Sequence, residues 1–463
     1  MSKRLLLWTG ALLLLALAAT SAVFAWRMAS ETARGFAADK GEGDPREPTI
    51  VAVAPTAVPT ADPPGWPNLF GPQHNSVSSE GGLSVAWTSA GPPRVWSREI
   101  GTGYSAPVAL GERLIVLHRL GDEEVVECFD PETGDSRWQH RYPTSYQCKY
   151  RYSNGPYSTP IIDDEFVFAV GAEGALRCLN AADGQLVWRR DLSDEYQLEE
   201  GLFGVGSTPL LEGDRLIFNV GAYKDDAGVI ALDRRTGATL WTATDHRAGY
   251  ATPIAATIHG RRYVFVVTYE GLVALDPRDG RVFWSIDQRP MSPDSLNATS
   301  PAVWGDLVLM VTGPGPGALC LRVSPDGGYE EVWRDRRVLD SQFNPLVCTD
   351  GYLFGYTSSR QGGAVFRCVQ AATGRMCWEW ESVLDRGTVL AADGKLILLG
   401  EQGHLAALAA TPREARPLSP IVEPLLSGPC YSAPALHRGR LILRNEGTLL
   451  SLDLRDTASL DSP

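Results

Sequence analysis

The chain has 463 residues and a formal net charge of −13, and 44% of its residues are hydrophobic. This hydrophobic content is typical of a folded protein and excludes an intrinsically disordered one, and the negative charge argues against a nucleic-acid partner or an anionic membrane surface for the folded part. With 47 Gly, 32 Pro and 13 Trp, the composition favours short strands joined by tight turns, so we expect an all-β fold.

The first segment, residues 1–29, is predicted to be a membrane anchor or a signal peptide. A basic pair, Lys3 and Arg4, precedes an uncharged apolar run at residues 5–26, which is long enough to span a bilayer as a hydrophobic helix. The sequence at 23–25 also fits a cleavage site, so both alternatives stay open. The basic pair favours export of the remainder. We therefore expect the folded part on the periplasmic side of the cell envelope, anchored in the inner membrane or secreted.

The rest of the chain divides by composition into a linker, one large domain and a tail. Residues 30–65 are rich in Pro, Ala and Thr and lack hydrophobic periodicity, which is typical of an extended, disordered linker. Residues 66–456 carry regular apolar runs and are expected to form the folded domain. Residues 457–463 are expected to form a short C-terminal tail.

Eight repeats of one pattern fill the expected domain. A repeat typically begins with Ser/Thr-x-Pro, continues with apolar runs and ends with Asp-x-x-Thr-Gly, often followed by Trp. The first and last prolines give a mean period of (434 − 107)/7, or about 47 residues, which is the length of a four-stranded propeller blade. The positions are Pro107, Pro160, Pro209, Pro253, Pro301, Pro345 and Pro434, with Val389 in place of Pro in the seventh repeat.

Within a repeat, the Asp-x-x-Thr-Gly segment predicts a tight turn between the third and fourth strands. Gly adopts a positive φ without steric cost, and the Asp side chain accepts hydrogen bonds from backbone N–H groups two residues on. The following Trp is expected to cover the outer strand, with its indole N–H bonded to a carbonyl. In the third repeat these residues are Asp233, Gly237 and Trp241.

The two ends of the repeat array predict how the ring closes. The eighth repeat stops at Leu454 without a fourth strand, whereas residues 95–100 precede the first repeat and have the pattern of an orphan outer strand with its own Trp96. Pairing these segments closes the ring and removes two open sheet edges. We therefore expect eight blades, with the last built from both ends of the domain. A seven-bladed ring is the alternative, because the seventh repeat is degenerate and lacks the Trp.

Several motifs are similar to those of a known family. They are Trp66-Pro67-Asn68-Leu69-Phe70-Gly71-Pro72, Gly155-Pro156-Tyr157-Ser158-Thr159-Pro160 and Tyr250-Ala251-Thr252-Pro253. On these motifs the chain resembles the bacterial PQQ-binding-like β-propeller repeat proteins over nearly all of residues 66–454. The resemblance implies one of two classes. Quinoprotein dehydrogenases hold pyrroloquinoline quinone (PQQ) and Ca²⁺ and oxidise an alcohol or a sugar, whereas BamB-like scaffolds hold partner proteins and no cofactor.

The residues that the resemblance implies for the dehydrogenase class are missing from this sequence. No two Cys are adjacent, and no Cys-x-x-Cys-His segment occurs that could attach a covalent haem. The seven His are scattered singly, without metal-ligand spacing. We therefore predict no catalytic, cofactor-binding or metal-binding residues. We expect a membrane-tethered scaffold that binds envelope proteins or peptides, with a PQQ- and Ca²⁺-dependent dehydrogenase as the alternative.

The most suggestive segment for binding is the connection from Arg141 to Tyr157, which interleaves five tyrosines with basic residues. Tyr and Arg are enriched at binding hot spots, and loops on a rigid scaffold commonly carry function. The alternative is that these rings cover a blade edge or plug the channel. The acidic connection at 191–203 is the hypothesised counterpart on the same face. The candidate partner-binding residues are Tyr146, Lys149, Tyr150, Arg151 and Tyr152.

Eight Cys in an exported chain raise the question of disulfides. Cys368 and Cys377 flank one predicted turn symmetrically, so they could face each other across a hairpin. Because cross-strand disulfides are often strained, a bonded and a free pair both remain open.

Overall fold

The computed structural model describes residues 65–150, 152–198, 203–222, 226–292, 296–358 and 363–456. The chain divides into two compact units, residues 1–54 and 55–463, and all of the described residues belong to the second. The expected anchor, the expected tail and the expected linker apart from Gly65 lie outside the described residues. In the described part of the chain, no helix is long and apolar enough to cross a membrane.

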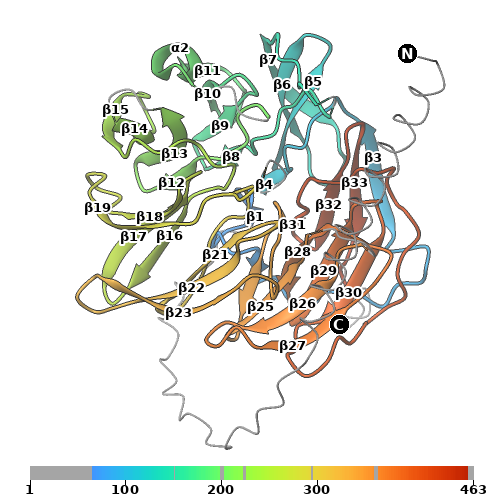
Figure 1. The fold of residues 1–463 in the computed structure, drawn as a ribbon. Coiled ribbons are helices and arrows are strands. Elements are labelled where there is room, and N and C mark those ends of the chain that lie inside the picture. The colour runs from blue at the N-terminus through green and yellow to red at the C-terminus, as the bar shows by residue number, and fades with distance from the viewer. Residues whose placement is uncertain are drawn as a thin grey trace, which may run out of the picture. The chain divides into compact units, whose positions relative to one another are not determined.

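The described residues form eight sheets arranged as blades around a central axis (Figure 1). In each of the first six blades, four strands follow one another in sequence order and pair antiparallel. The first strand of a blade lies near the axis and the fourth lies at the periphery, as β8 and β19 illustrate in Figure 1. One short helix, α2 (Leu192–Tyr196), follows the second blade.

The strand bounds follow the predicted repeats. Blades 1 to 3 contain β4 (Val108–Leu110), β5 (Arg113–Leu120), β6 (Glu123–Phe129) and β7 (Ser136–Pro143); β8 (Ile161–Ile162), β9 (Phe166–Val170), β10 (Ala175–Asn180) and β11 (Leu186–Asp191); and β12 (Leu210–Glu212), β13 (Arg215–Ala222), β14 (Ala227–Asp233) and β15 (Thr239–Ala243). Blades 4 to 6 contain β16 (Ile254–Ile258), β17 (Arg261–Val267), β18 (Gly271–Leu275) and β19 (Val282–Asp287); β20 (Ala302–Trp304), β21 (Leu307–Thr312), β22 (Gly317–Val323) and β23 (Tyr329–Asp335); and β24 (Val347–Thr349), β25 (Tyr352–Tyr356), β26 (Phe366–Gln370) and β27 (Met376–Trp380). Blades 7 and 8 contribute β28 (Gly387–Ala392), β29 (Lys395–Gly400) and β30 (Leu405–Ala409); and β31 (Ala435–His437), β32 (Arg440–Arg444) and β33 (Thr448–Asp453).

The ring closes as the sequence predicts. Strand β3 (Arg94–Glu99) pairs antiparallel with β33 and supplies the fourth strand of blade 8, with Trp96 opposite Ser451. The described sheets number eight, so the eight-bladed prediction is confirmed and the seven-bladed alternative is wrong. Blade 7 is the degenerate one. Residues 416–422 run beside β30 in place of a regular fourth strand, and the N–H of Leu418 donates to the Ala407 carbonyl at 2.8 Å.

Tryptophans of the outer strands join each blade to the next. The Trp241 indole of blade 3 donates to the Pro277 carbonyl of blade 4 at 3.1 Å, and its ring lies on the turn glycine Gly280. Gly280 has φ +74°, and an added Cβ would meet the Trp241 ring at 2.5 Å, so only Gly satisfies both the turn and the ring. Trp96, Trp188, Trp333 and Trp378 make equivalent bonds. The predicted Trp–carbonyl bond is therefore confirmed in five blades, and the carbonyl belongs to the neighbouring blade. It is absent at Trp138 and Trp284, whose indole N–H groups have no partner among the described residues.

In blades 1 to 5, the residue before the motif proline links neighbouring first strands around the axis. The backbone N–H of Ala106 donates to Thr159 Oγ1 at 3.0 Å, and the N–H of Thr159 donates to Thr208 Oγ1 at 2.9 Å. The same bond continues from Thr208 to Thr252 at 3.4 Å and from Thr252 to Ser300 at 2.9 Å. The hydroxyls of the repeated motif thus satisfy buried N–H groups where the blades converge.

The segment before the ring covers one end of the central axis. Strand β1 (Gly65–Trp66) pairs with β4 of blade 1, the carbonyl of Pro67 accepts from Ile162 of blade 2, and β2 (Val77–Ser78) pairs in parallel with β28 of blade 7. All three contacts lie at the end of the inner strands where the first strand turns into the second. Residues 65–80, which we call the plug, therefore close that end of the ring.

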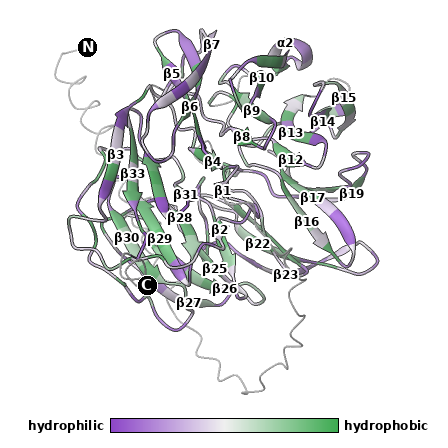
Figure 2. Ribbon diagram, turned by 180° about the vertical axis from the view of Figure 1, so that it is seen from behind, coloured by the Kyte–Doolittle hydropathy of each residue, from purple (hydrophilic) through white to green (hydrophobic). Residues whose placement is uncertain are grey.

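The core lies between the blades, where the sheets pack face to face. Third strands such as β18 are buried along their whole length, whereas fourth strands such as β19 alternate between buried and exposed residues. Figure 2 shows the same division, with hydrophobic residues concentrated in strands such as β28, β29 and β33. All eight cysteines are free thiols in this structure, Cys368 and Cys377 included.

A buried arginine fastens blade 8 to blade 1. Arg444, at the end of β32, is 0% exposed and donates to five backbone carbonyls. Burial lowers the pKa of its guanidinium to about 9, still charged at neutral pH. The accepting carbonyls are those of Gly101, Gly103, Ser105, Leu117 and Asn445. Because each buried polar group is paired, the cation ties the closing strands together.

Candidate functional site

The two ends of the ring differ in chemistry. Because the strands of a blade alternate in direction, one end carries the turns between second and third strands together with the connections between blades. We call this end the loop face. The plug occupies the opposite end, where His74 is partly buried near Glu212 and Arg262; desolvation lowers its pKa to about 4. The loop face is therefore the open end of the axis and the candidate location of a binding site.

A chain of aromatic rings borders the axis on the loop face. We call the six residues that form it the aromatic rim: Tyr104, Tyr157, Phe203, Tyr250, Phe343 and Tyr431. Successive ring centroids lie 5.9 Å apart from Tyr250 to Phe203, 6.0 Å to Tyr157, 6.1 Å to Tyr104, 5.2 Å to Tyr431 and 5.2 Å to Phe343. Every ring comes from a connection that leads into a blade, so the rim spans most of the ring.

Sequence reasoning missed this rim, although the signal is present. Four repeats carry Tyr three residues before the motif position occupied by Pro: Tyr104, Tyr157, Tyr250 and Tyr431. A blade repeat places equivalent residues at equivalent radii, so a repeated aromatic residue in the connection produces a ring of aromatics. Phe203 and Phe343 stand at other offsets, and only the structure shows that they fill the gaps.

The predicted binding residues lie beside the rim where the structure describes them. Tyr150 and Tyr152 are 54% and 57% exposed, and their rings lie 6.2 and 5.8 Å from that of Phe203. Tyr146 is half-buried and packs perpendicular to Tyr157 at 6.0 Å. Lys149 lines a cleft nearby, and Arg151 lies outside the described residues.

The predicted connection begins later than the sequence suggested. Arg141 and Tyr142 belong to β7, and Tyr142 is buried between blades 1 and 2 with the Arg177 guanidinium 4.7 Å from its ring centroid. The strand extends past the expected boundary because its apolar positions pack against the neighbouring blade. Tyr142 therefore has a packing role. This is the role that the alternative interpretation gave to all five tyrosines of the segment.

The described part of the connection is held in place by a buried arginine and a partly buried glutamate. Arg119 Nη1 donates to the Tyr146 carbonyl at 2.7 Å and to the Asn154 carbonyl at 3.3 Å. Glu173 accepts from the Ser145 backbone N–H at 3.0 Å and from the Thr144 hydroxyl at 2.7 Å. Burial raises the pKa of the Glu173 carboxyl, but these hydrogen bonds outweigh burial and hold it below the usual value. The loop is thus ordered before any partner arrives.

Only part of the acidic connection at 191–203 lies where it could contact a ligand on the loop face. Glu195, in α2, is bound to Arg190 at 2.8 Å, and the Tyr196 hydroxyl bonds Thr239 at 3.0 Å. These pairs direct the acidic helix toward the outer strands. Leu198 and Phe203, in contrast, reach the cleft described next. Glu199 and Glu200 lie outside the described residues.

A cleft of about 460 Å³ opens on the loop face between blades 3 and 4. We call it the blade 3–4 cleft. Its size is within the range of small-ligand and side-chain binding pockets. Its wall includes a rigid cationic group: Arg247 donates to Glu270 at 2.9 Å, and its guanidinium lies 3.7 Å from the Tyr269 ring centroid. Other wall residues are Lys149, Tyr150, Phe203, Tyr250, Asn219 and Asn297.

On the opposite side of the rim, an ion pair within blade 7 is linked to the connection before blade 8. Arg386 makes a bidentate pair with Glu401, both contacts at 2.9 Å, and the Tyr431 hydroxyl donates to Glu401 at 2.7 Å. Burial and this carboxylate raise the pKa of Tyr431. Burial together with Glu446 raises the pKa of Tyr104 to about 12. The phenols of the rim are therefore neutral hydrogen-bonding groups at physiological pH.

Three arginines of the loop face and the blade junctions already have partners, so none of them is free to receive the charge of an anionic cofactor. Arg386 is bound to Glu401, Arg247 to Glu270, and Arg444 to backbone carbonyls. Within the described ranges, no group of three or more His, Cys, Asp and Glu side chains is placed to hold a metal ion.

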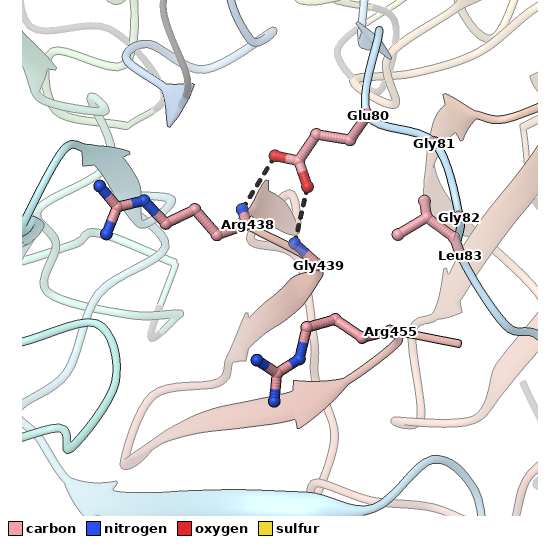
Figure 3. A pocket seen from close by; sticks show the side chains of 7 residues that line it. All are labelled: Glu80, Gly81, Gly82, Leu83, Arg438, Gly439 and Arg455. Carbon is pink, nitrogen blue, oxygen red and sulfur yellow. Dashed lines mark hydrogen bonds between the residues drawn. The ribbon is translucent and has the colours of Figure 1, made fainter. Parts of the chain in front are cut away.

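A second cavity, of about 320 Å³, lies at the plug end of the ring (Figure 3). Glu80 accepts from the backbone N–H groups of Arg438 and Gly439 at 2.9 and 2.7 Å, as the dashed lines show. The Arg438 side chain is paired with Glu112 and Arg455 with Asp453. Because the charged side chains around this cavity are already paired, we interpret it as the place where the plug is attached to blade 8.

Comparison with known proteins gives a consistent picture. A family model described as "Outer membrane protein assembly factor BamB" matches residues 121–379. The chain is 27% identical over 171 residues to the outer membrane protein assembly factor BamB of Burkholderia pseudomallei, covering 36% of this chain and 40% of that protein. It is 26% identical over 217 residues to the BamB of Yersinia pestis, covering 45% and 47%. The chain thus spans less than half the length of the curated relatives it matches.

Solved structures show the same fold at low identity. The crystal structure of BamB from Moraxella catarrhalis matches with a TM-score of 0.57 at 17% identity, covering 78% of this chain and 99% of that one. The quinohemoprotein alcohol dehydrogenase of Comamonas testosteroni matches with a TM-score of 0.62 at 14% identity, covering 84% and 80%. At these identities the likeness concerns the propeller fold alone.

Proposed function

The chain belongs to the family described as outer membrane protein assembly factor BamB, and we propose that it is a cofactor-free scaffold of the cell envelope. In this proposal the ring is exported and tethered by the N-terminal segment. Its partners are envelope proteins or peptides, and they bind on the loop face. The relatives are named as outer membrane protein assembly factors, which supports this class of partner.

The observation that carries the proposal is the ordered aromatic surface at the open end of the ring. Exposed Tyr150 and Tyr152 stand on Phe203, and Arg119 and Glu173 hold the connection in place. Tyrosine offers a large contact area and a hydrogen-bonding tip at low entropic cost. Because the loop is already ordered, binding loses less conformational freedom. The plug closes the other end, so partners approach from one side.

Site-specific crosslinking tests this function. A photoreactive phenylalanine at position 150 or 152 of the full-length protein in its native membranes should crosslink to envelope proteins. The same group at Trp304, an exposed residue at the plug end of blade 5, serves as the control. Replacing Tyr146, Lys149 and Arg151 by Ala should weaken capture about tenfold or more, the effect of losing a few hot-spot contacts. Unchanged capture by that triple variant would contradict the proposal.

Calorimetric titration with PQQ and Ca²⁺ tests the dehydrogenase alternative in the same preparation. The cofactor-free proposal predicts no saturable heat. Saturable binding accompanied by dye-linked alcohol oxidation would replace the scaffold with an oxidoreductase.

A further inference from the structure

The floor of the blade 3–4 cleft holds a polar group without a partner. Asn219, at the end of β13, is 1% exposed, and its Nδ2 donates to the Val267 carbonyl at 3.3 Å. Among the described residues its Oδ1 accepts no hydrogen bond. A buried acceptor left unpaired costs roughly 1–3 kcal/mol, so its presence needs an explanation.

The fold itself does not require a polar residue at this position. Asn219 stands two residues after Ile217, which pairs with Leu210 on the first strand of its blade. The same register places apolar residues in five other blades: Leu117, Val170, Val267, Val311 and Leu399. The remaining two blades carry Tyr356 and Arg444. Arg444 is fully paired, which distinguishes its fastening role from the unpaired Asn219.

A bulge brings this part of β13 to the cleft. The pairing with β14 is regular up to Asn219 and resumes only at Ala222, which leaves Val220 and Gly221 out of the ladder. Both of these residues line the cleft, as Asn219 does. Bulges of this kind redirect side chains and are frequent beside functional sites. The local backbone is therefore shaped to place this segment in the wall.

The chemistry of the wall selects the occupant. Glu270 is paired with Arg247, and Asn297 is bonded on both sides, with Nδ2 donating to the Thr268 carbonyl at 2.8 Å and Oδ1 accepting from Thr312 at 2.7 Å. Of the buried side-chain polar atoms in the described wall, Asn219 Oδ1 is the one without a partner. A sugar would bring several hydroxyls against rings and paired groups, at a desolvation cost. An aromatic side chain with one neighbouring N–H matches the wall better.

We propose that the blade 3–4 cleft binds an extended peptide segment of a partner protein. One aromatic side chain enters between Phe203, Tyr250 and Tyr269, and a backbone N–H of the segment donates to Asn219 Oδ1. Aromatic pairs in such a wall favour edge-to-face contacts, and the Arg247 guanidinium adds a cation beside the entering ring. The inference rests on the proposed scaffold function and adds the chemical class that the partner presents.

The probe is a capped tripeptide, acetyl-Gly-(4-fluoro-Phe)-Gly-amide, titrated against the full-length protein by fluorine NMR. We expect saturable binding in the millimolar range or tighter, and about a tenfold loss when the Phe nitrogen is methylated, because the donor is then missing. The variant N219V carries the residue found in other blades, so it should fold, and it should lose about tenfold. W304A at the plug end should bind like the wild type.

Each other outcome overturns the inference in a distinct way. Equal binding by N219V and the wild type would show that a buried water, and no peptide N–H, satisfies Asn219. Binding of N-acetylglucosamine disaccharide in place of the peptide would assign the cleft to a glycan. Absence of tripeptide binding, with crosslinked capture through Tyr150 retained, would reject the cleft and leave the scaffold function standing. Loss of both would reject the scaffold as well.

Discussion

Three junctions between blades carry a buried polar residue at the same position of the second strand: Asn219, Tyr356 and Arg444. Asn219 and Arg444 differ most in how their polar groups are paired. At the junction of blades 8 and 1, Arg444 donates to five carbonyls and has no capacity left. At the junction of blades 3 and 4, Asn219 keeps an unpaired acceptor beside a cleft. A saturated buried group stabilises the fold, whereas an unsaturated one costs stability and is available to a ligand. The first junction is therefore structural, and the second is the candidate for binding.

The largest effect is expected at the structural junction. Replacing Arg444 by Leu removes the cation and leaves five buried carbonyls unpaired, so the free energy of unfolding should fall by about 3–5 kcal/mol. Urea denaturation followed by fluorescence measures the change. Arg455→Ala, which removes an exposed partner of Asp453, should cost less than about 1 kcal/mol. A small effect of Arg444→Leu would mean that blade 8 is held by strand pairing alone.

The tryptophan contacts should not distinguish the two junctions. Trp96 and Trp241 are 6% and 8% exposed, and each donates to a proline carbonyl of the next blade at 3.0 and 3.1 Å. Trp96→Ala and Trp241→Ala should each lower the free energy of unfolding by about 3–4 kcal/mol, through lost burial and the cavity that remains. Parallel denaturation of both variants tests the comparison. A difference above about 2 kcal/mol between the two variants would mean that the junctions also differ in how much their tryptophan side chains stabilise the fold.

The plug should make the ring sensitive to acid. Burial depresses the pKa of His74 from 6.5 to about 4 in the folded protein. Above pH 6.5 the side chain is neutral in both states, so stability is fully present. As pH falls from about 6.5 to about 4, the unfolded state binds the proton first and stability is lost, on the order of 2 kcal/mol. His74→Asn tolerates the positive φ of this residue and should flatten the stability profile between those pH values. A profile that the substitution leaves unchanged would contradict this assignment.

The smallest effect is a gain. Asn219→Val removes an unpaired buried acceptor and introduces the residue that other blades carry, so the free energy of unfolding should rise by about 1 kcal/mol. Asn297→Val is the matched control. That carboxamide is bonded at both ends, so its loss should destabilise the protein by about 2 kcal/mol. If both substitutions destabilise equally, Asn219 is satisfied in solution by water.

The sequence by itself determined the architecture, because a propeller repeats one local solution. The Asp and Gly of each turn, the outer Trp, the blade period and the orphan strand at 95–100 are all readable from spacing, and each follows from the chemistry of a single blade. The rim tyrosines follow the same repetition, because residues such as Tyr157 and Tyr250 each lie three residues before the motif proline.

Only the tertiary structure decided what lies between blades. Phe203 completes the rim, Arg444 donates to carbonyls of blade 1, and Asn219 Oδ1 is left without a donor. Each of these outcomes depends on residues from different repeats. The position of the plug has the same origin, since residues 65–80 touch strands from blades at both ends of the domain. Local sequence propensity specifies the structure of a single blade. The pairing of a buried polar group depends instead on which residues of the neighbouring blade lie against it, and those neighbours are set only when the ring is closed.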